Sequence, residues 1–480
     1  MRAADTFRFL TVGTSARLVR NLWDRIAARA RYPISHLVHP TYDRSSWDEK
    51  TSSNKIYFFR DDMRACMPPP DRDLLESLER KDVPTIHNMI MGDRVVSKLR
   101  YEDALAYGTF LARRLIEIYR EIKPSVVIGD FDALHSSLAL AVARQLNIPW
   151  FALHFTTIPS GQVAFCANLS PASTVLLEPE RRQDLRGRAQ EVLRNFETGK
   201  ARAPAYLPPE LLSPAFMFTH VPSQLRSVLQ VLRRRKLRAH RKYSDYRNSY
   251  RLSSLFQEAY RLRKNLLNIG RQKDLLLTPP PDMRYAFFGL HMQPESSIDV
   301  FAYFFSNQFR IIELIARSLP PTHALLVKLH KSDVPNYSPA YLARLSQFPS
   351  VRVVAPHSDA LQFIRKADLV VGIQGTIGLE AALLGKPVIM FGDSPIKVFP
   401  NVATFGKAID LPALVRVKLA EEKPERSKIV ESFANYLAPF YAASGNDWSI
   451  VPSDSEIDGY AHAFKLLERH LVEERAVDCN

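Results

Sequence analysis

The residues best suited to bind a ligand lie between Leu369 and Asp393. There an apolar segment stops at Gln374-Gly375-Thr376, and a short helical pattern and a second apolar segment follow. This order predicts a strand, a glycine turn, a helix and a strand, which is one βαβ unit with buried parallel strands. The amino end of such a helix binds phosphate through its backbone N–H groups and its dipole. Gln374, Gly375 and Thr376 therefore predict a phosphate site, the alternative being a purely structural tight turn.

Three charged or titratable side chains are expected on the same edge. Glu380 lies one helical turn beyond Thr376, close enough to reach a sugar attached to the phosphate. Lys328 and His330 are two residues apart on a predicted strand, so we expect both to point to one side and meet the phosphate. The alternatives are a surface helix charge for Glu380 and a solvated strand end for Lys328 and His330.

Glu295 and Ser296 follow a further predicted strand in the same part of the chain. Because ligands of doubly wound sheets bind outside the carboxyl ends of the strands, this loop is expected to contribute to the same site. The alternative is a helix N-cap, since Ser297 and Asp299 are good capping residues.

The first third of the chain offers candidates for a base. Asp130 follows the apolar segment 125–129, and His154 ends the segment 149–154. A carboxylate or imidazole at such a strand end could take a proton from an acceptor hydroxyl. The alternatives are that the Asp130-Phe131-Asp132 stretch caps the following helix and that His154 is a structural histidine.

Two regions of alternating strand and helix patterns position these residues. Such alternation predicts α/β architecture with two doubly wound, Rossmann-like domains facing a cleft. Between them lies a proline-rich stretch with two basic helical patterns, closed by three consecutive prolines at Pro279. We predict four parts: 1–175 for the acceptor, 176–281 as linker and basic helices, 282–427 for the nucleotide sugar, and 428–480 as closing helices.

The charge of the chain is concentrated in this middle stretch. Net charge is +15, and residues 226–274 contain 15 Lys or Arg against 3 Asp or Glu. Elsewhere the chain is nearly neutral, so we expect no nucleic-acid binding. The basic helices are either solvated or contact anionic lipid headgroups or an anionic acceptor, through a cluster consisting of Arg233, Arg234, Arg235 and Lys236.

Several functional classes are disfavoured by what the sequence lacks. The three cysteines have no paired or metal-like spacing, which fits a reducing compartment. No GxGxxG follows the first strand, and neither a GxxxxGK[ST] nor a GxSxG motif is present. Asp130-Phe131-Asp132 has the form of a DxD motif, but the sheet pattern is not that of a single-domain, metal-dependent transferase. We expect no metal and no cofactor.

The sequence also predicts a cytoplasmic protein. Its first residues contain no uninterrupted apolar core of signal-peptide length, and no apolar run is long enough to span a bilayer. A peripheral contact with the inner membrane would use the basic cluster.

Motifs in the last third resemble those of the capsule polysaccharide biosynthesis proteins, which include Kdo transferases. Four stretches carry the resemblance over residues 285–400: FGLHMQPESS from Phe288, LVKLH from Leu326, ADLVV from Ala367 with GTIGLEA from Gly375, and LGKPV from Leu384. Relatives often have His-Pro where this chain has His330-Lys331.

The resemblance implies a two-domain fold of the GT-B type and metal-independent transfer from a nucleotide sugar. It implies phosphate contacts for Lys328, His330 and Thr376, and a ribose contact for Glu380. We therefore expect a glycosyltransferase of surface polysaccharide assembly, with CMP-Kdo as the candidate donor and a lipid-linked or polysaccharide acceptor. The alternatives are a nucleotide-sugar epimerase of the same fold and a non-enzymatic polysaccharide assembly or export protein.

Overall fold

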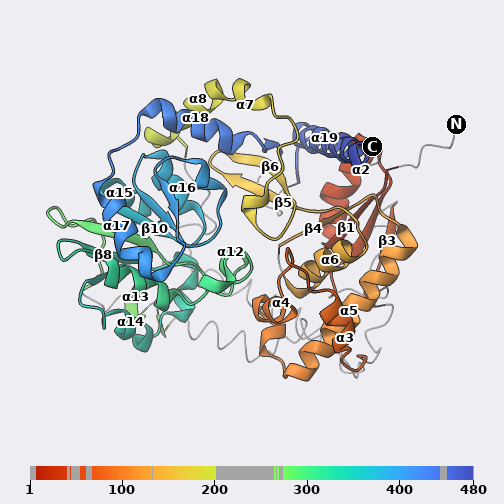
Figure 1. Ribbon diagram of the computed structural model, residues 1–480, viewed down its shortest axis with the longest axis horizontal. Helices are drawn as coiled ribbons and strands as arrows, with labels where there is room; N and C mark the ends of the chain where they lie inside the picture. Colours follow the sequence, from red (N-terminus) through yellow and green to blue (C-terminus); the bar gives the residue numbers. More distant parts are fainter. Residues whose placement is uncertain are drawn as a thin grey trace. The chain divides into compact units, whose positions relative to one another are not determined.

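The computed structural model describes residues 7–40, 44, 54–60, 67–131, 133–201, 264, 265, 267–269, 274–443 and 451–478. By their contacts these residues form two compact units, each built on one sheet (Figure 1). The first unit runs through Leu185 and resumes at Leu437, and the second takes the described residues from Arg186 to Tyr436. The two expected Rossmann-like α/β folds are confirmed.

The sheet of the first unit has seven strands in the order β13-β6-β5-β4-β1-β2-β3. Strands β1 to β5 are parallel, whereas β6 and β13 are antiparallel additions at one edge. The chain turns back at Ile158 and Pro159, so β6 pairs antiparallel with β5. The strands are β1 (Phe9–Thr14), β2 (Ile34–Val38), β3 (Lys55–Tyr57), β4 (Val126–Gly129), β5 (Trp150–Thr157), β6 (Ser160–Cys166) and β13 (Tyr441–Ala442).

Helices from both ends of the chain cover the first sheet. Phe464 of α19 packs on Phe9 of β1 and Phe165 of β6, with ring centroids 5.1 and 5.2 Å apart. Figure 1 shows α19 in dark blue beside α2. The helical segments are α1 (Ala16–Leu18), η1 (Val19–Trp23), α2 (Asp24–Ala30), α3 (Arg72–Ser77), α4 (Ile86–Gly92), η4 (Val96–Lys98), α5 (Tyr101–Ile122), α6 (Ala133–Gln145), η5 (Pro171–Ser173), α7 (Arg181–Asp184) and α19 (Asp454–Asp478).

The sheet of the second unit has six parallel strands in the order β12-β11-β10-β7-β8-β9. Its central strands are fully buried and apolar, as expected for a sheet covered on both faces. Five strands match the predicted ones, and β12 is additional. They are β7 (Tyr285–Gly289), β8 (Ala324–Lys328), β9 (Val351–Val354), β10 (Leu369–Gly372), β11 (Val388–Met390) and β12 (Val402–Thr404).

The regular helix α13 of this unit begins at Gln308, where the side chain of Asn307 accepts a hydrogen bond from Arg310 N (3.2 Å). The helical segments are α8 (Arg186–Glu197), α12 (Ser296–Asp299), η8 (Tyr303–Phe305), α13 (Gln308–Ser318), η9 (Lys331–Asn336), α14 (Pro339–Leu345), α15 (Ala360–Lys366), α16 (Thr376–Leu383), η10 (Pro395–Val398), η11 (Ala408–Asp410), α17 (Leu411–Ala420) and α18 (Arg426–Leu437).

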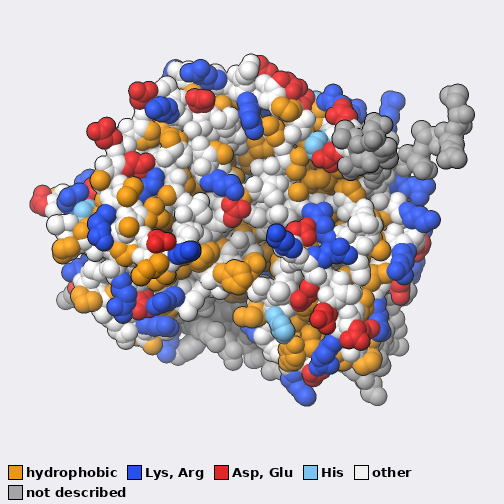
Figure 2. Space-filling model, viewed as in Figure 1, with side chains coloured by type: hydrophobic (Ala, Val, Ile, Leu, Met, Phe, Trp, Pro, Cys, Tyr) orange, Lys and Arg blue, Asp and Glu red, His pale blue; other side chains and the backbone are white. Residues whose placement is uncertain are grey.

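The predicted basic cluster, Arg233 to Lys236, lies outside the described residues. On the face shown in Figure 2, basic and acidic side chains are interspersed. No helix in the described part of the chain is both long and apolar enough to cross a membrane.

Candidate functional site

The second sheet has a topological switch point between β7 and β10. From β7 the chain winds outward through β8 and β9, and it then returns to the other side of β7 to form β10, β11 and β12. Ligands of doubly wound sheets bind outside the carboxyl ends of the strands at such a point. The loops after β7, β8 and β10 therefore define the candidate site, which we call the donor edge.

The turn after β10 is shaped by Gly375. This residue has φ +86° and ψ −172°, a region open to glycine but strained for other residues. It precedes Thr376, the first residue of α16, as the sequence predicted. Gln374 is buried and its side-chain amide donates to the carbonyl oxygen of Asp393 at 2.6 Å. The side chain of Gln374 thus has a structural role. The amino end of α16, which the sequence predicts to bind phosphate, begins two residues later.

His330 lies beyond β8, not on it, because the strand ends at Lys328. The imidazole caps η9 by accepting a hydrogen bond from Ser332 N at Nδ1 (3.2 Å), and His330 N donates to Tyr337 Oη (2.7 Å). Burial, together with the nearby charges of Lys328 and Lys331, lowers the pKa of His330 to about 4. The ring is therefore neutral at neutral pH, with Nε2 left to carry the proton.

Lys328 is oriented differently from the sequence-based expectation. Its ammonium group donates to the carbonyl oxygens of Leu329 (3.1 Å) and Pro356 (3.0 Å), and only 6% of the residue is exposed. Burial lowers its pKa to about 8. Because its donors bind the backbone of the loops after β8 and β9, the structure gives Lys328 a role in holding these loops together.

Glu295 and Ser296 stand where α12 begins. The Glu295 carboxylate accepts from Ser297 N (3.1 Å) and from the Ser297 hydroxyl, while Glu295 N donates to Asp299 Oδ2 (2.9 Å). This reciprocal pair is a helix cap, which was the alternative considered for this loop. Ser296 is the first residue of α12, so both residues border the donor edge, and their contact with a ligand stays a prediction.

Glu380 occupies the predicted place on α16. It is half-buried, one turn after Thr376. The contact of Glu380 with a ribose stays a prediction.

Two residues of the donor edge were not among the predicted site residues. The His291 ring, after β7, accepts a hydrogen bond from Gln374 N at Nε2 (3.4 Å). Asp333 is buried after β8, accepts from Asn336 Nδ2 at 2.6 Å, and has a pKa raised by burial to about 6. The rule that strand ends carry ligand residues could have identified His291, because it directly follows the strand pattern. Asp333 carried no comparable signal.

The first unit has its own switch point, between β1 and β4. Asp130 follows β4 there and is half-buried, and the Ser136 hydroxyl donates to its Oδ1. Gly13, near the carboxyl end of β1, has φ +81°, and a Cβ on it would lie 3.2 Å from Asp130 Oδ2 and 2.6 Å from His135 Nε2. The backbone of Gly13 thus lies directly against the Asp130–His135 pair, which we call the acceptor edge.

His154 lies on β5, next to β4 in the sheet. Its ring lies between Phe131 and Phe440, with centroids 6.3 and 5.8 Å away. Burial lowers its pKa to about 4. We prefer Asp130 of the two, because its half-buried carboxylate lies at the switch point, whereas the His154 ring contacts Phe131 and Phe440.

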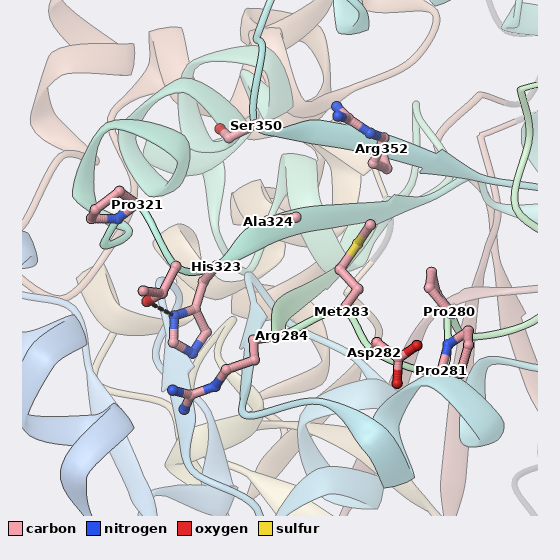
Figure 3. Close-up of a pocket in the computed structure, with 11 residues that line it drawn as sticks. Pro280, Pro281, Asp282, Met283, Arg284, Pro321, His323, Ala324, Ser350 and Arg352 are labelled. Carbon is pink, nitrogen blue, oxygen red and sulfur yellow. Dashed lines mark hydrogen bonds between the residues drawn. The ribbon is translucent and has the colours of Figure 1, made fainter.

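A cavity of about 640 Å³ opens at the opposite end of the second sheet (Figure 3). It is lined by residues at the amino ends of β7, β8 and β9, among them Arg284, His323 and Arg352. Arg284 and His323 both contact Asp368 Oδ2, at 3.2 and 3.3 Å. Since this is the amino end of the strands, the cavity is separate from the donor edge.

No group of three or more His, Cys, Asp or Glu side chains within the described ranges is arranged to hold a metal ion.

Comparison with known proteins relates the donor edge to one family. Residues 225–398 match the family model described as capsule polysaccharide biosynthesis protein. No protein with a curated description matches the chain in sequence.

Solved structures with a similar arrangement have low scores. The Thermosulfurimonas dismutans KpsC beta Kdo 2,4 transferase is 15% identical over 70% of this chain and 87% of its own, with a TM-score of 0.34. The Methanocaldococcus jannaschii UDP-GlcNAc 2-epimerase, in complex with UDP-GlcNAc and UDP, is 12% identical over 90% and 99%, with a TM-score of 0.29. A Rickettsia africae glycosyltransferase is 9% identical over 97% and 98%, with a TM-score of 0.31. Because these TM-scores are low, we assign no function to this chain from these structures.

Proposed function

Residues 225–398 belong to the capsule polysaccharide biosynthesis protein family, and on that premise we propose that the chain is a glycosyltransferase using a nucleotide sugar. The observation that carries the proposal is the position of the match. It contains β7, β8, β10 and α16, and therefore every residue of the donor edge. The part of the chain with family resemblance thus includes the switch point of the second sheet.

The donor edge suits a phosphate because it combines a helix amino end with the neutral imidazole of His330, whose Nε2 carries a proton that it can donate. In the proposed reaction the phosphate lies at the amino end of α16 near His330, and Glu380 binds the ribose. As the acceptor oxygen attacks the anomeric carbon, the bond to phosphate breaks and the nucleotide leaves with the bonding electrons. Helix amides and His330 stabilise the negative charge of the leaving group, which is the basis for proposing transfer without a metal.

Asp130 is proposed to take the proton of the attacking acceptor hydroxyl. Its carboxylate is half-buried and held by Ser136. We propose CMP-Kdo as the donor, since it carries a single phosphate and the donor edge offers one helix terminus.

Nucleotide binding is the direct test. Thermal shift with CMP, UDP, CMP-Kdo and UDP-GlcNAc should show stabilisation that grows with ligand concentration, most strongly for the cytidine compounds. His330→Ala should weaken binding by roughly 10–100-fold, because a hydrogen bond to a charged group is lost. The matched control is His87→Ala, an exposed histidine of α4 in the first unit.

Three outcomes would redirect the proposal. Absence of stabilisation by every nucleotide would favour a non-enzymatic assembly or export protein. Conversion of a bound nucleotide sugar without an acceptor would favour an epimerase. Equal affinity in wild type and His330→Ala would remove His330 from the phosphate site.

The basic cluster is proposed to hold the enzyme at the cytoplasmic face of the inner membrane, near a lipid-linked acceptor. Four adjacent cations would attract anionic lipids by roughly 1 kcal/mol each. Replacing Arg233, Arg234, Arg235 and Lys236 with glutamine should therefore reduce co-sedimentation with vesicles containing anionic lipid. Unchanged sedimentation would leave the cluster as a solvated surface.

A further inference from the structure

The His291 ring lies against the backbone turn that leads into α16. Its Nε2 accepts the hydrogen bond of Gln374 N at 3.4 Å, and a Cβ on Gly375 would lie 3.2 Å from its Cε1. The imidazole edge thus faces the last backbone groups before the helix. In the free protein, a ring nitrogen takes the amide hydrogen that an anion would otherwise accept.

The backbone of His291 is fixed by Gln308 of α13. Gln308 Oε1 accepts from His291 N at 2.8 Å, and its Nε2 donates to His291 O at 3.1 Å. The same Nε2 donates to Gln293 Oε1 at 3.3 Å. Since Gln308 is 6% exposed, this clamp is internal and His291 is a positioned group.

The surroundings of His291 keep its ring neutral. A nitrogen that accepts an amide hydrogen bond has no proton, so the neutral ring carries its proton on Nδ1. Burial, and then the neighbouring His330, lower the pKa of His291 to about 4. The nearest charged groups act through His330, whose neighbours are Lys328 and Lys331, and Asp333 lies on the following η9. The direct hydrogen-bond partners of His291, which are Gln308 and Gln374, are uncharged. An arriving phosphate would therefore change the charge balance around the ring.

We propose that His291 is a proton-coupled phosphate ligand of this site. When a phosphate occupies the amino end of α16, Nε2 of His291 takes one proton from solvent and donates it as a hydrogen bond to a phosphate oxygen. The amide of Gln374 is released from the ring and donates to the anion as well. This inference rests on the proposed function, since it requires the donor edge to bind a nucleotide phosphate.

The coupling has a definite sign. A ligand that raises the folded-state pKa of His291 binds most tightly below the free value of about 4. Affinity then falls as pH rises, by up to about tenfold per pH unit, until the pKa of the complex is passed. Binding takes up a proton only between the free pKa and the pKa of the complex, so uptake at pH 7 requires that the phosphate raise the pKa of His291 above 7.

Calorimetry of CMP binding to the full chain tests this. Titrations at pH 6, 7 and 8 in buffers of different ionisation enthalpy give the number of protons taken up per CMP bound. We expect uptake of a substantial fraction of a proton in the wild type and in the control His87→Asn. His291→Asn keeps a hydrogen-bonding side chain that does not titrate, and it should lose most of the uptake and flatten the pH dependence.

The outcomes separate this inference from the proposed function. If no nucleotide binds the wild type, the proposed function fails. If CMP binds without proton uptake, His291 is not proton-coupled although the donor edge stands. Uptake that survives in His291→Asn but disappears in His330→Asn would assign the proton to His330. Should His291→Asn fail to fold, the wild-type measurement still decides whether coupling exists, and His291→Gln replaces it.

Discussion

The two units have the same kind of switch point and opposite chemistry. In the second unit, the edge combines the amino end of α16 with the neutral ring of His330, which can give a hydrogen bond, and with His291, whose ring accepts the Gln374 N–H. In the first unit, the edge presents the carboxylate of Asp130, held by Ser136 and close to His135. The proposed phosphate site and the proposed proton acceptor thus stand at the same kind of switch point. They differ in the residues at the carboxyl ends of the strands.

Asp130→Asn should have the largest effect and should affect transfer alone. Loss of a general base costs about 10²–10⁴-fold in rate. Since Asp130 belongs to the first unit, the affinity for nucleotide should change by less than about twofold. Radiometric transfer from the nucleotide sugar that binds, together with calorimetry, measures both. A variant with full transfer activity would remove Asp130 from the chemistry.

A pair of glycine substitutions separates the two edges. Gly375→Ala forces a side chain into a positive-φ turn and against His291, so nucleotide affinity should fall about tenfold or more. Gly13→Ala places a Cβ against His135 and Asp130, so transfer should fall while nucleotide affinity holds. Gly187→Ala, at a position with no atom within 4 Å of the added Cβ, is the control. If Gly375→Ala and Gly13→Ala both reduced nucleotide affinity, or both reduced transfer alone, the assignment of separate roles to the donor edge and the acceptor edge would be wrong.

Lys328→Ala should change stability more than binding. It leaves the carbonyl oxygens of Leu329 and Pro356 without their donor, which costs about 1–3 kcal/mol. Nucleotide affinity should stay within about threefold, because the ammonium group points at the backbone. Urea unfolding and calorimetry provide the two values.

The pH dependence of stability offers a second measure for Lys328. Its folded pKa is about 8, below the ordinary value of 10.5. Between these values the unfolded chain binds more protons, so stability rises with pH through this window. The rise should be absent in Lys328→Ala. A large loss of nucleotide affinity without a loss of stability would instead support the original phosphate assignment.

Sequence periodicity predicted the elements better than it predicted the direction of side chains. The apolar runs before Gly375 and Asp130 gave β10 and β4 because buried parallel strands are continuous and apolar. Lys328 and His330 were expected to point one way, but β8 ends between them and each side chain follows its own hydrogen bonds. The residue at which a strand ends depends on hydrogen bonds to neighbouring loops, and the local sequence pattern carries no information about those loops.

Capping explains another difference. Glu295 was predicted to bind a ligand, yet its carboxylate accepts hydrogen bonds within its own helix turn. Short polar segments offer several local partners, and the choice between them is made by packing. His291 shows the converse, because only the parallel pairing of β7 with β10 brings it to Gln374.

The return of α19 to the first sheet has a consequence for biosynthesis. Phe464 completes a core begun by Phe9, and Arg25 pairs with Asp454 at 2.8 Å, so the first unit contains contacts between residues more than four hundred positions apart. Domains generally fold in the order in which they are translated. Among the described residues, the second unit takes a single stretch, from Arg186 to Tyr436, and can close while the first still exposes part of its core. The unit whose strands emerge first from the ribosome is the last to be finished.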